Sequence, residues 1–291
     1  MKIYLVLFLT VFTVTATAAS SLARFPLSVF LDTELIRTKR DGRIIGGADA
    51  KEGEFPWMVS LQRNGFFGRS HFCAGSIADA SSIITAAHCL EELHPIGVWA
   101  VAGEHRLDLV SGYEQELRAA QFVLHEEYDP DYLRNDIGII RLNGTFVFNS
   151  YLKQAKFPGS GYFTHPDTAV TVAGWGTTKE GGNLSNVLLK TTVPVVSDED
   201  CRLIYGAGLI VDSMLCAGYT SGGYDSCQGD SGGQLMLGDK TLVGIVSWGK
   251  GCGQPDYPGV YTEVSAYIGW INMKLSTAEA SNNTNISQLN N

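Results

Sequence analysis

The stretch that organises the chain is Asp225-Ser226-Cys227-Gln228-Gly229-Asp230-Ser231-Gly232-Gly233. Glycine accepts positive φ angles and lets another molecule approach the backbone closely. A serine among three glycines can therefore present its hydroxyl group to a substrate, beside bare backbone N–H groups. The same pattern also fits an ordinary turn between strands, so other segments must decide between the two interpretations.

The composition favours an all-β protein with an acidic surface. The 291 residues suffice for one large or two medium domains, and an apolar content of 45% can form a sizeable core. The 33 glycines and the scarcity of long helical patterns favour short strands and tight turns. A formal net charge of −9 without any basic run argues against a nucleic-acid partner.

Residues 1–19 have the pattern of a secretory signal peptide. Lys2 precedes a short apolar stretch, and small residues suitable for cleavage follow at Ala16, Ala18 and Ala19. The apolar part is short for a bilayer span. We therefore expect a secreted, extracellular protein without a membrane partner. Four Asn-x-Ser/Thr sequons agree with secretion; they begin at Asn143, Asn183, Asn282 and Asn285.

Six cysteines in a secreted chain predict three disulfides, although their number alone does not determine the pairing. A zinc site is the alternative, because His71 and His88 lie near two of these cysteines, but the spacing matches no familiar zinc finger. We expect no metal and no cofactor. The cysteines are Cys73, Cys89, Cys201, Cys216, Cys227 and Cys252.

A boundary is expected after Arg43. Residues 20–43 are polar, lack cysteine and end in a group of basic residues, and the apolar, flexible sequence Ile44-Ile45-Gly46-Gly47 follows. This abrupt change indicates a proteolytic processing point, with an ordinary linker as the alternative. We expect a propeptide at 20–43, a folded domain at 44–275 and a polar, disordered tail at 276–291.

Short apolar or alternating runs separated by turn residues predict a β-barrel or β-sandwich. The last apolar segment, residues 267–275, has helical spacing and predicts a terminal helix packed on the core. The expected strands cover residues 58–62, 82–87, 98–102, 137–142, 169–175 and 242–248.

The serine hydroxyl of Ser231 needs a base to become a nucleophile. Histidine suits this role when a third group fixes its tautomer. Of six histidines, His88 is the best candidate because it follows an apolar run expected to form a rigid strand. Asp136 precedes another such run, so it can serve as the third group. Asp230 cannot easily do so, since its side chain and that of its neighbour Ser231 should diverge.

Three motifs in this order resemble the chymotrypsin-type serine proteases: Thr85-Ala86-Ala87-His88-Cys89, Asn135-Asp136-Ile137 and Gly229-Asp230-Ser231-Gly232-Gly233. The resemblance extends over residues 44–275. It implies two six-stranded antiparallel β-barrels with a C-terminal helix. It also implies that Ser231 is the nucleophile, His88 the general base and acid, and Asp136 the orienting group. The N–H groups of Gly229 and Ser231 would form the oxyanion hole.

The resemblance also implies how the chain is bridged and activated. Cleavage after Arg43 would free the α-amino group of Ile44, which would pair with the Asp230 carboxylate and order the oxyanion loop. The family pattern pairs the cysteines as Cys73–Cys89, Cys201–Cys216 and Cys227–Cys252.

Substrate selection is expected to depend on Asp225, which corresponds to the base of the pocket for the P1 side chain. A buried carboxylate there favours a long cationic side chain over an apolar one. Ser226 fits the trypsin-like form that accepts both Lys and Arg. The segment Ser247-Trp248-Gly249, together with Gly259, matches the family's pocket wall, whose two glycines leave the entrance open.

Other segments indicate the branch of the family and the departures from it. The sequence Gly174-Trp175-Gly176-Thr177-Thr178 and the segment 193–198 most resemble arthropod, especially crustacean, digestive trypsins. Gln234 stands where the family usually has proline. Residues 104–114 correspond to the calcium loop of vertebrate trypsins, but Arg106 and Ser111 replace expected ligands, so we expect no strong calcium site.

The sequence thus predicts a trypsin-like endopeptidase made as a zymogen, monomeric and digestive. Its expected partners are protein and peptide substrates and proteinaceous serine protease inhibitors. A processing protease of a clotting or immune cascade is one alternative. A catalytically inactive homologue that binds partners is another, although His88, Asp136 and Ser231 are all present.

Overall fold

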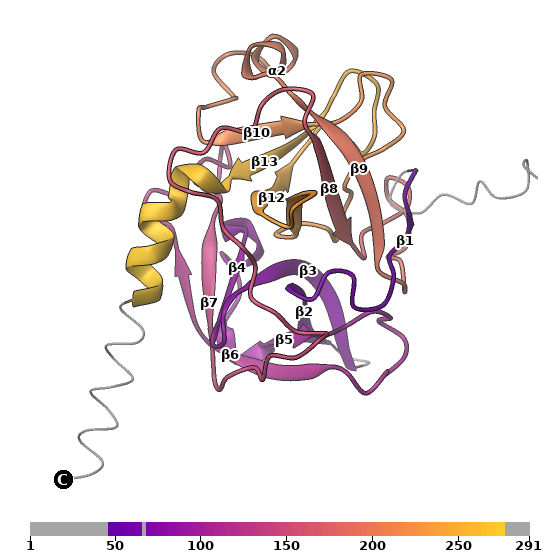
Figure 1. Cartoon of the computed structure of the whole chain (residues 1–291), viewed down its shortest axis with the longest axis vertical. Coiled ribbons are helices and arrows are strands. Elements are labelled where there is room, and N and C mark those ends of the chain that lie inside the picture. The colour runs from indigo at the N-terminus through magenta and orange to yellow at the C-terminus, as the bar shows by residue number, and fades with distance from the viewer. Residues whose placement is uncertain (1–45, 66–67, 277–291) are drawn as a thin grey trace, which may run out of the picture. The chain divides into compact units, whose positions relative to one another are not determined.

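The computed structural model describes residues 46–65 and 68–276, all within one unit of the chain, residues 42–291 (Figure 1). Several predictions concern residues outside this part of the chain. They are the signal peptide, the propeptide, the Arg43–Ile44 junction, the two sequons at Asn282 and Asn285, and all of the predicted tail except Ser276.

The first half of the described chain forms a closed antiparallel barrel with the strand order β2-β3-β4-β7-β6-β5 (Figure 1). Inward side chains such as Val59, Leu61, Ile83 and Ile140 are fully buried and fill its interior. The strands are β2 (Met58–Gly65), β3 (Gly68–Asp79), β4 (Ser82–Thr85), β5 (Val98–Ala102), β6 (Gln115–Leu124) and β7 (Gly138–Leu142).

The second half forms another six-stranded antiparallel barrel, which closes because β8 pairs with both β9 and β11. The short strand β1 (Ala48–Asp49) adds to β9. Helix α2 (Asp198–Tyr205) begins at the capping hydroxyl of Ser197. The strands are β8 (Ala169–Gly174), β9 (Leu189–Val196), β10 (Met214–Ala217), β11 (Gln234–Leu237), β12 (Leu242–Trp248) and β13 (Gly259–Glu263). The expected fold of two six-stranded barrels is confirmed.

The two barrels share an apolar layer. Successive side chains of a strand point to opposite faces, so Leu235 of β11 enters the second barrel while Met236 joins the buried cluster of the first. The chain ends in a 3₁₀ turn, η3 (Val264–Tyr267), followed by a helix over residues 268–276. Ile271 of this helix is buried in the same cluster, so the helix covers the core as predicted.

Four expected strand bounds were wrong: β2 extends to Gly65, β7 begins at Gly138, β8 ends at Gly174, and β4 ends early. The expected strand 82–87 ends at Thr85, and Ala87–Cys89 form a 3₁₀ turn, η1. The turn forms because the backbone N–H of His88 donates to Asp136 Oδ1 at 2.9 Å, instead of continuing the strand ladder. His88 therefore lies on a turn beyond the strand. Among the described residues, no helix is both long and apolar enough to span a membrane.

Candidate active site

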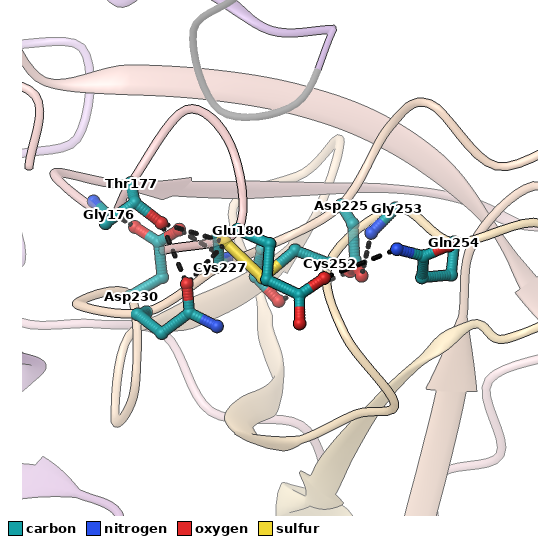
Figure 2. The surroundings of a disulfide bond; sticks show 11 residues. Gly176, Thr177, Glu180, Asp225, Cys227, Asp230, Cys252, Gly253 and Gln254 are labelled. Atoms are coloured by element: carbon teal, nitrogen blue, oxygen red, sulfur yellow. Dashed lines mark hydrogen bonds between the residues drawn. A yellow bond between two sulfur atoms is a disulfide. The ribbon is translucent and has the colours of Figure 1, made fainter. Parts of the chain in front are cut away.

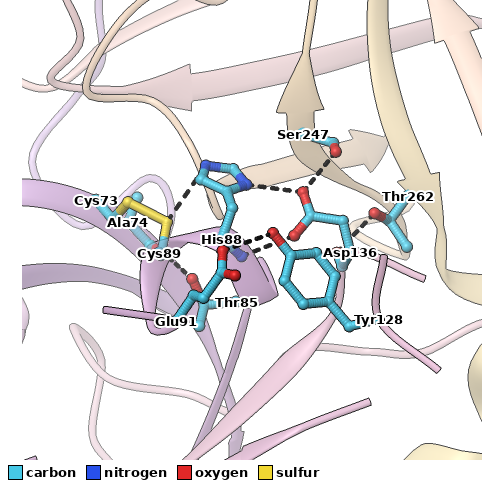
Figure 3. Close-up of polar contacts among 10 residues, drawn as sticks. All are labelled: Cys73, Ala74, Thr85, His88, Cys89, Glu91, Tyr128, Asp136, Ser247 and Thr262. Atoms are coloured by element: carbon cyan, nitrogen blue, oxygen red, sulfur yellow. Dashed lines mark hydrogen bonds and ion pairs between the residues drawn. A yellow bond between two sulfur atoms is a disulfide. The ribbon is translucent and has the colours of Figure 1, made fainter. Parts of the chain in front are cut away.

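His88 and Asp136 meet at the end of the first barrel. The η1 turn directs His88 toward Asp136. Asp136 lies just before β7 and is 1% exposed. The Nδ1 atom of His88 lies 2.7 Å from Asp136 Oδ2. Figure 3 shows the ring facing this carboxylate, with the contact dashed. A carboxylate beside Nδ1 keeps the proton on that nitrogen and leaves Nε2 able to accept one.

The second barrel holds Asp136 in place. Ser247 of β12 donates its hydroxyl to Asp136 Oδ2 at 2.6 Å, and Thr262 of β13 donates to the backbone carbonyl of Asp136 at 2.7 Å. Both oxygens of the buried Asp136 carboxylate thus accept hydrogen bonds, which compensates for its removal from water. The His88–Asp136 pair therefore belongs to both barrels.

Ser231 lies on the loop that enters β11 and lines a pocket of the second barrel. Its carbonyl accepts a hydrogen bond from the N–H of Ala74 in β3 at 2.8 Å, which ties the loop to the first barrel. Gly232 has a φ of 74°, and a Cβ there would overlap the Thr85 side chain, so glycine is required.

No hydrogen bond joins Ser231 Oγ to His88 Nε2 within the described part of the chain. The contact recorded at Nε2 is a loose one with Cys89 Sγ, at 3.8 Å. Catalytic hydrogen bonds are often long in empty sites and tighten when substrate binds. The structure therefore supports the pair His88–Asp136 more directly than the approach of Ser231.

The loop that contains Ser231 has backbone N–H groups that find no hydrogen-bond acceptor among the described residues. The Gln228 carbonyl accepts from Thr177 N at 2.8 Å and the Gly229 carbonyl accepts from His71. With the carbonyls turned that way, the N–H groups of Gly229 and Ser231 donate to no acceptor among the described residues. Free donors of this kind can bind a developing oxyanion.

His71 is a site residue whose role the sequence did not reveal. It is 7% exposed; its Nε2 lies 2.8 Å from the Gly229 carbonyl and its Nδ1 lies 2.8 Å from Ser60 Oγ. Burial lowers the pKa of His71 to about 4, so the ring is neutral. Because a carbonyl only accepts, Nε2 carries the proton and Nδ1 accepts from Ser60. No local pattern around His71 signals this contact, which spans 158 residues.

All of the predicted P1-pocket residues line one cavity of 140 Å³, next to Ser231. A Cβ at Gly259 would lie only 2.8 Å from Asp225 Oδ1, so any side chain there would obstruct the carboxylate. A Cβ at Gly249 would make only ordinary contacts. The predicted lining residues that meet here are Asp225, Ser226, Ser247, Trp248, Gly249 and Gly259.

The Asp225 carboxylate lies in this cavity, and no described residue supplies it with a countercharge. It is 5% exposed, accepts a 2.9 Å hydrogen bond from the N–H of Gly253, and lies 3.4 Å from Ser226 Oγ. Burial raises the pKa of Asp225 to about 6, against the weaker effect of these donors. A cation entering the cavity would therefore be strongly favoured.

Asp230 points away from Ser231 and into the protein. It is 0% exposed, and its two carboxyl oxygens accept from Gly176 N at 2.8 Å and Cys227 N at 2.9 Å. Burial raises the pKa of Asp230 to about 7. A Cβ at Gly174 or Gly176 would overlap this carboxyl, which explains both glycines. The described residues therefore provide hydrogen bonds for Asp230 but no cation.

The family to which this two-barrel chain belongs follows from its similarity to known protein families. The trypsin family model matches residues 44–271, which is most of the chain. The chain belongs to the trypsin family of serine proteases. It is therefore a serine endopeptidase, a hydrolase that acts on protein substrates.

This trypsin-family protease is similar to several curated relatives. It is 48% identical to Trypsin-1 of Astacus astacus over 78% of this chain and 98% of the relative. It is 37% identical to trypsin of Sus scrofa, over 82% and 98%. It is 38% identical to cationic trypsin-3 of Rattus norvegicus, over 79% and 89%. The higher identity to the crustacean protein agrees with the resemblance inferred from the sequence.

The protease contains the three disulfides that the resemblance implied. Cys73–Cys89 connects β3 to the His88 turn, Cys201–Cys216 connects α2 to β10, and Cys227–Cys252 joins two walls of the cavity that Asp225 lines. Cys73, Cys89 and His88 lie close together. Because both sulfurs are bridged, they offer no thiolate for the zinc site considered as an alternative.

The segment that corresponds to the calcium loop of the vertebrate trypsins fits the ion poorly. Ser111 and Gly112 donate to the Glu114 carboxylate at 2.7–2.8 Å, so the loop itself occupies those oxygens. Arg106 pairs with Asp108 at 2.9 Å and brings a cation to the same loop. Burial and the nearby Glu114 raise the pKa of Glu104 to about 7, which favours its neutral form. Ca²⁺ prefers several available anionic oxygens.

Proposed function

We propose that this protease is secreted as a zymogen and, once activated, cleaves peptide bonds after Arg or Lys. The observation that carries this proposal is the buried Asp225 carboxylate in the cavity beside Ser231. A desolvated carboxylate that remains unpaired is costly, so a substrate that supplies a cation is preferred over an apolar one.

The reaction follows from the groups around the cavity. His88 Nε2 takes the Ser231 proton as Ser231 Oγ attacks the scissile carbonyl, and the N–H groups of Gly229 and Ser231 stabilise the oxyanion. His88 then gives the proton to the leaving amine, which departs and leaves an acyl-enzyme. Water then takes the place of the amine. His88 accepts a proton from the water as it attacks the acyl-enzyme, and returns that proton to Ser231 Oγ when the new carboxyl group leaves. Asp136 stabilises the imidazolium that forms in each step.

Activation is proposed to follow cleavage after Arg43. The new Ile44 ammonium would supply the cation that the buried Asp230 carboxylate lacks among the described residues. A buried pair of this kind can bias the Asp230–Ser231 loop toward its ordered form. Arg43 itself fits a trypsin-type cleavage site, so autoactivation is included in the proposal. Sequencing the amino terminus of the active, secreted protein tests signal removal and the Arg43 cut together.

Specificity is tested with matched peptide substrates that carry Arg, Lys or Phe at P1. We expect kcat/KM to be highest for the two cationic residues and to fall steeply for Arg in the variant Asp225→Ser. Preferential cleavage after Phe would contradict the pocket argument. Labelling of Ser231 by an organophosphate distinguishes an active enzyme from an inactive, partner-binding homologue.

A digestive role is proposed ahead of limited processing in a cascade. The trypsins in the comparison, including the crustacean one, support this choice. A digestive enzyme should degrade many sites in unfolded casein, whereas a processing enzyme should cut few.

Glycosylation at the exposed residues Asn143 and Asn183 is also proposed, and mass spectrometry of the secreted protein tests it. A monomeric state is tested by sedimentation.

A further inference from the structure

A tight turn presents the Glu180 side chain at the edge of the active site. Gly182 N donates to the Lys179 carbonyl at 2.9 Å, and Gly181 has a φ of 66°, the positive value required at the third position of a type II turn. Glu180 occupies the second position. The stem of Lys179 folds back on the turn, 2.9 Å from where a Cβ of Gly182 would be.

The base of this loop is fixed to the residues around the nucleophile. Thr177 donates its backbone N–H to the Gln228 carbonyl at 2.8 Å and its hydroxyl to Gln228 Oε1 at 3.0 Å. Thr177 also forms a bridge with Leu184 across the loop. A Cβ at Gly229 would overlap the Leu184 side chain, so the loop packs directly on the oxyanion backbone.

The Glu180 carboxylate reaches the rim of the P1 pocket. Its Oε2 atom accepts a 3.3 Å hydrogen bond from Gln254 Nε2, and Figure 2 shows the two side chains pointing toward each other. The same oxygen lies 3.1 Å from the position of a Cβ on Gly251, a residue that lines the pocket. A side chain on Gly251 would therefore separate Glu180 from the entrance.

The segment Gly251–Gln254 lies between two carboxylates. Its inner side is fixed by the hydrogen bond from Gly253 N to Asp225 Oδ2 and by the Cys227–Cys252 disulfide (Figure 2). Its outer side contacts Glu180. Asp225 is thus the carboxylate at the base of the pocket, and Glu180 is a second one at the rim.

The nearby Lys250 leaves the Glu180 charge available. Within the described part of the chain, no cation lies within ion-pair distance of Glu180. Lys250 instead donates to the Tyr257 hydroxyl at 2.9 Å and lies 4.0 Å from the centre of that ring. Glu180 is exposed, so its carboxylate can meet a cation that approaches the pocket from solvent.

We propose that Glu180 is a specificity-determining residue that attracts cationic P1 side chains to the pocket entrance. The inference rests on the proposed Arg/Lys specificity and adds a second charge to it. Because Glu180 acts on approach and not on the reacting atoms, it affects KM and leaves kcat unchanged. An exposed charge acts through water and is screened by salt, so its effect is about 2–5-fold at low ionic strength.

The test compares Glu180→Gln with the wild type, since glutamine keeps the partner for Gln254 and removes only the charge. We expect KM for an Arg substrate and Ki for benzamidine to rise about 2–5-fold in about 20 mM NaCl, with kcat unchanged. In about 500 mM NaCl the difference should disappear. Glu52→Gln, which removes an exposed carboxylate outside the pocket and its loops, is the matched control and should behave as the wild type.

Two results would overturn the inference. One is equal KM and Ki for wild type and Glu180→Gln at low salt. The other is a rise in KM for Glu180→Ala with normal values for Glu180→Gln, which would show that the contact with Gln254 matters and the charge does not. A wild-type enzyme that fails to bind benzamidine or cleave after Arg would instead contradict the proposed function.

Discussion

Ser247 donates its hydroxyl to the buried carboxylate of Asp136 at 2.6 Å, across the boundary between the two barrels. The same carboxylate oxygen lies 2.7 Å from His88 Nδ1. Ser247 therefore stabilises the charge that holds the histidine, and it also lines the proposed P1 pocket. One hydroxyl thus connects the proposed substrate pocket to the His88–Asp136 pair.

Replacing Ser247 with alanine should weaken catalysis through Asp136. A hydrogen bond to a charged group contributes about 1.5–3 kcal/mol, so we expect kcat to fall about 10–100-fold for an Arg substrate. Thr262→Val, which removes a donor to the backbone carbonyl of Asp136, is the control and should lower stability more than kcat. An unchanged kcat in Ser247→Ala would contradict the role assigned to the hydroxyl.

Binding of a cationic inhibitor should depend on the ionisation of Asp225. Burial raises the pKa of this carboxyl to about 6, and a bound cation favours the ionised form. The affinity for benzamidine should therefore increase with pH up to about 6 and stay constant above it. Below that value it should weaken by up to about tenfold per pH unit. Isothermal titration calorimetry measures the affinity for benzamidine directly, so the part that the histidine plays in turnover does not affect the result. Asp225→Asn should bind weakly at every pH, and a pH-independent wild type would contradict the prediction.

Asp230 should destabilise the uncleaved chain as the pH rises. Burial raises the pKa of its carboxyl to about 7, so the folded state holds the proton more tightly than the unfolded state. The contribution of this group to the free energy of unfolding is fully present at acidic pH. It falls by at most about 4 kcal/mol as the pH rises from about 4 to about 7.

The experiment for Asp230 uses denaturant unfolding of the uncleavable variant Arg43→Gln, with and without Asp230→Asn. The second substitution should remove most of this pH dependence. In the cleaved enzyme, Asp230→Asn should lower kcat/KM about 100–1,000-fold, because the proposed pair with Ile44 is lost. Full activity of that variant would argue against the activation mechanism.

Gln234 should be a site where an apolar residue stabilises the protein. Its side chain is 0% exposed, and both amide atoms lack a hydrogen-bond partner among the described residues. It faces the apolar layer between the barrels, opposite Ile245 and two residues before Met236. Gln234→Met keeps the length of the side chain and should raise the free energy of unfolding by about 1–3 kcal/mol. Gln234→Glu should do the reverse, and a destabilised methionine variant would show that the amide is satisfied.

Calcium should have little effect on the stability of the activated enzyme. Glu114 accepts hydrogen bonds from its own loop, and Arg106, paired with Asp108, adds a cation to the same loop. We therefore expect the Tm of the activated wild-type enzyme, measured by calorimetry, to be the same in excess EDTA and in millimolar Ca²⁺. The variant Arg106→Gln tests the cause, because a Ca²⁺-dependent Tm that appears there would identify the cation as the obstacle. A large Ca²⁺-dependent increase in the wild type would contradict the prediction.

Much of the candidate site could be predicted from the sequence because its residues lie in short motifs. Ser231 and Asp225 belong to one nine-residue stretch, and the pocket that they line is present in the structure. His88 and Asp136 lie beside apolar runs that form β4 and β7, and adjacent pairing of these strands brings the two residues together. The strand ending before His88 was misplaced by two residues, because an extended apolar run does not reveal where a turn begins.

The amino-acid sequence by itself determined the reactive groups, the acidic pocket residue and the alternation that produces short strands, since these depend on residue type and local spacing. Only the tertiary structure decided how the groups are held. His71 reaches Gly229, Ser247 reaches Asp136 and Glu180 reaches Gln254 across separations of 158, 111 and 74 residues. Such contacts depend on the closure and mutual packing of two barrels, and local sequence patterns do not encode which distant side chains that packing brings together.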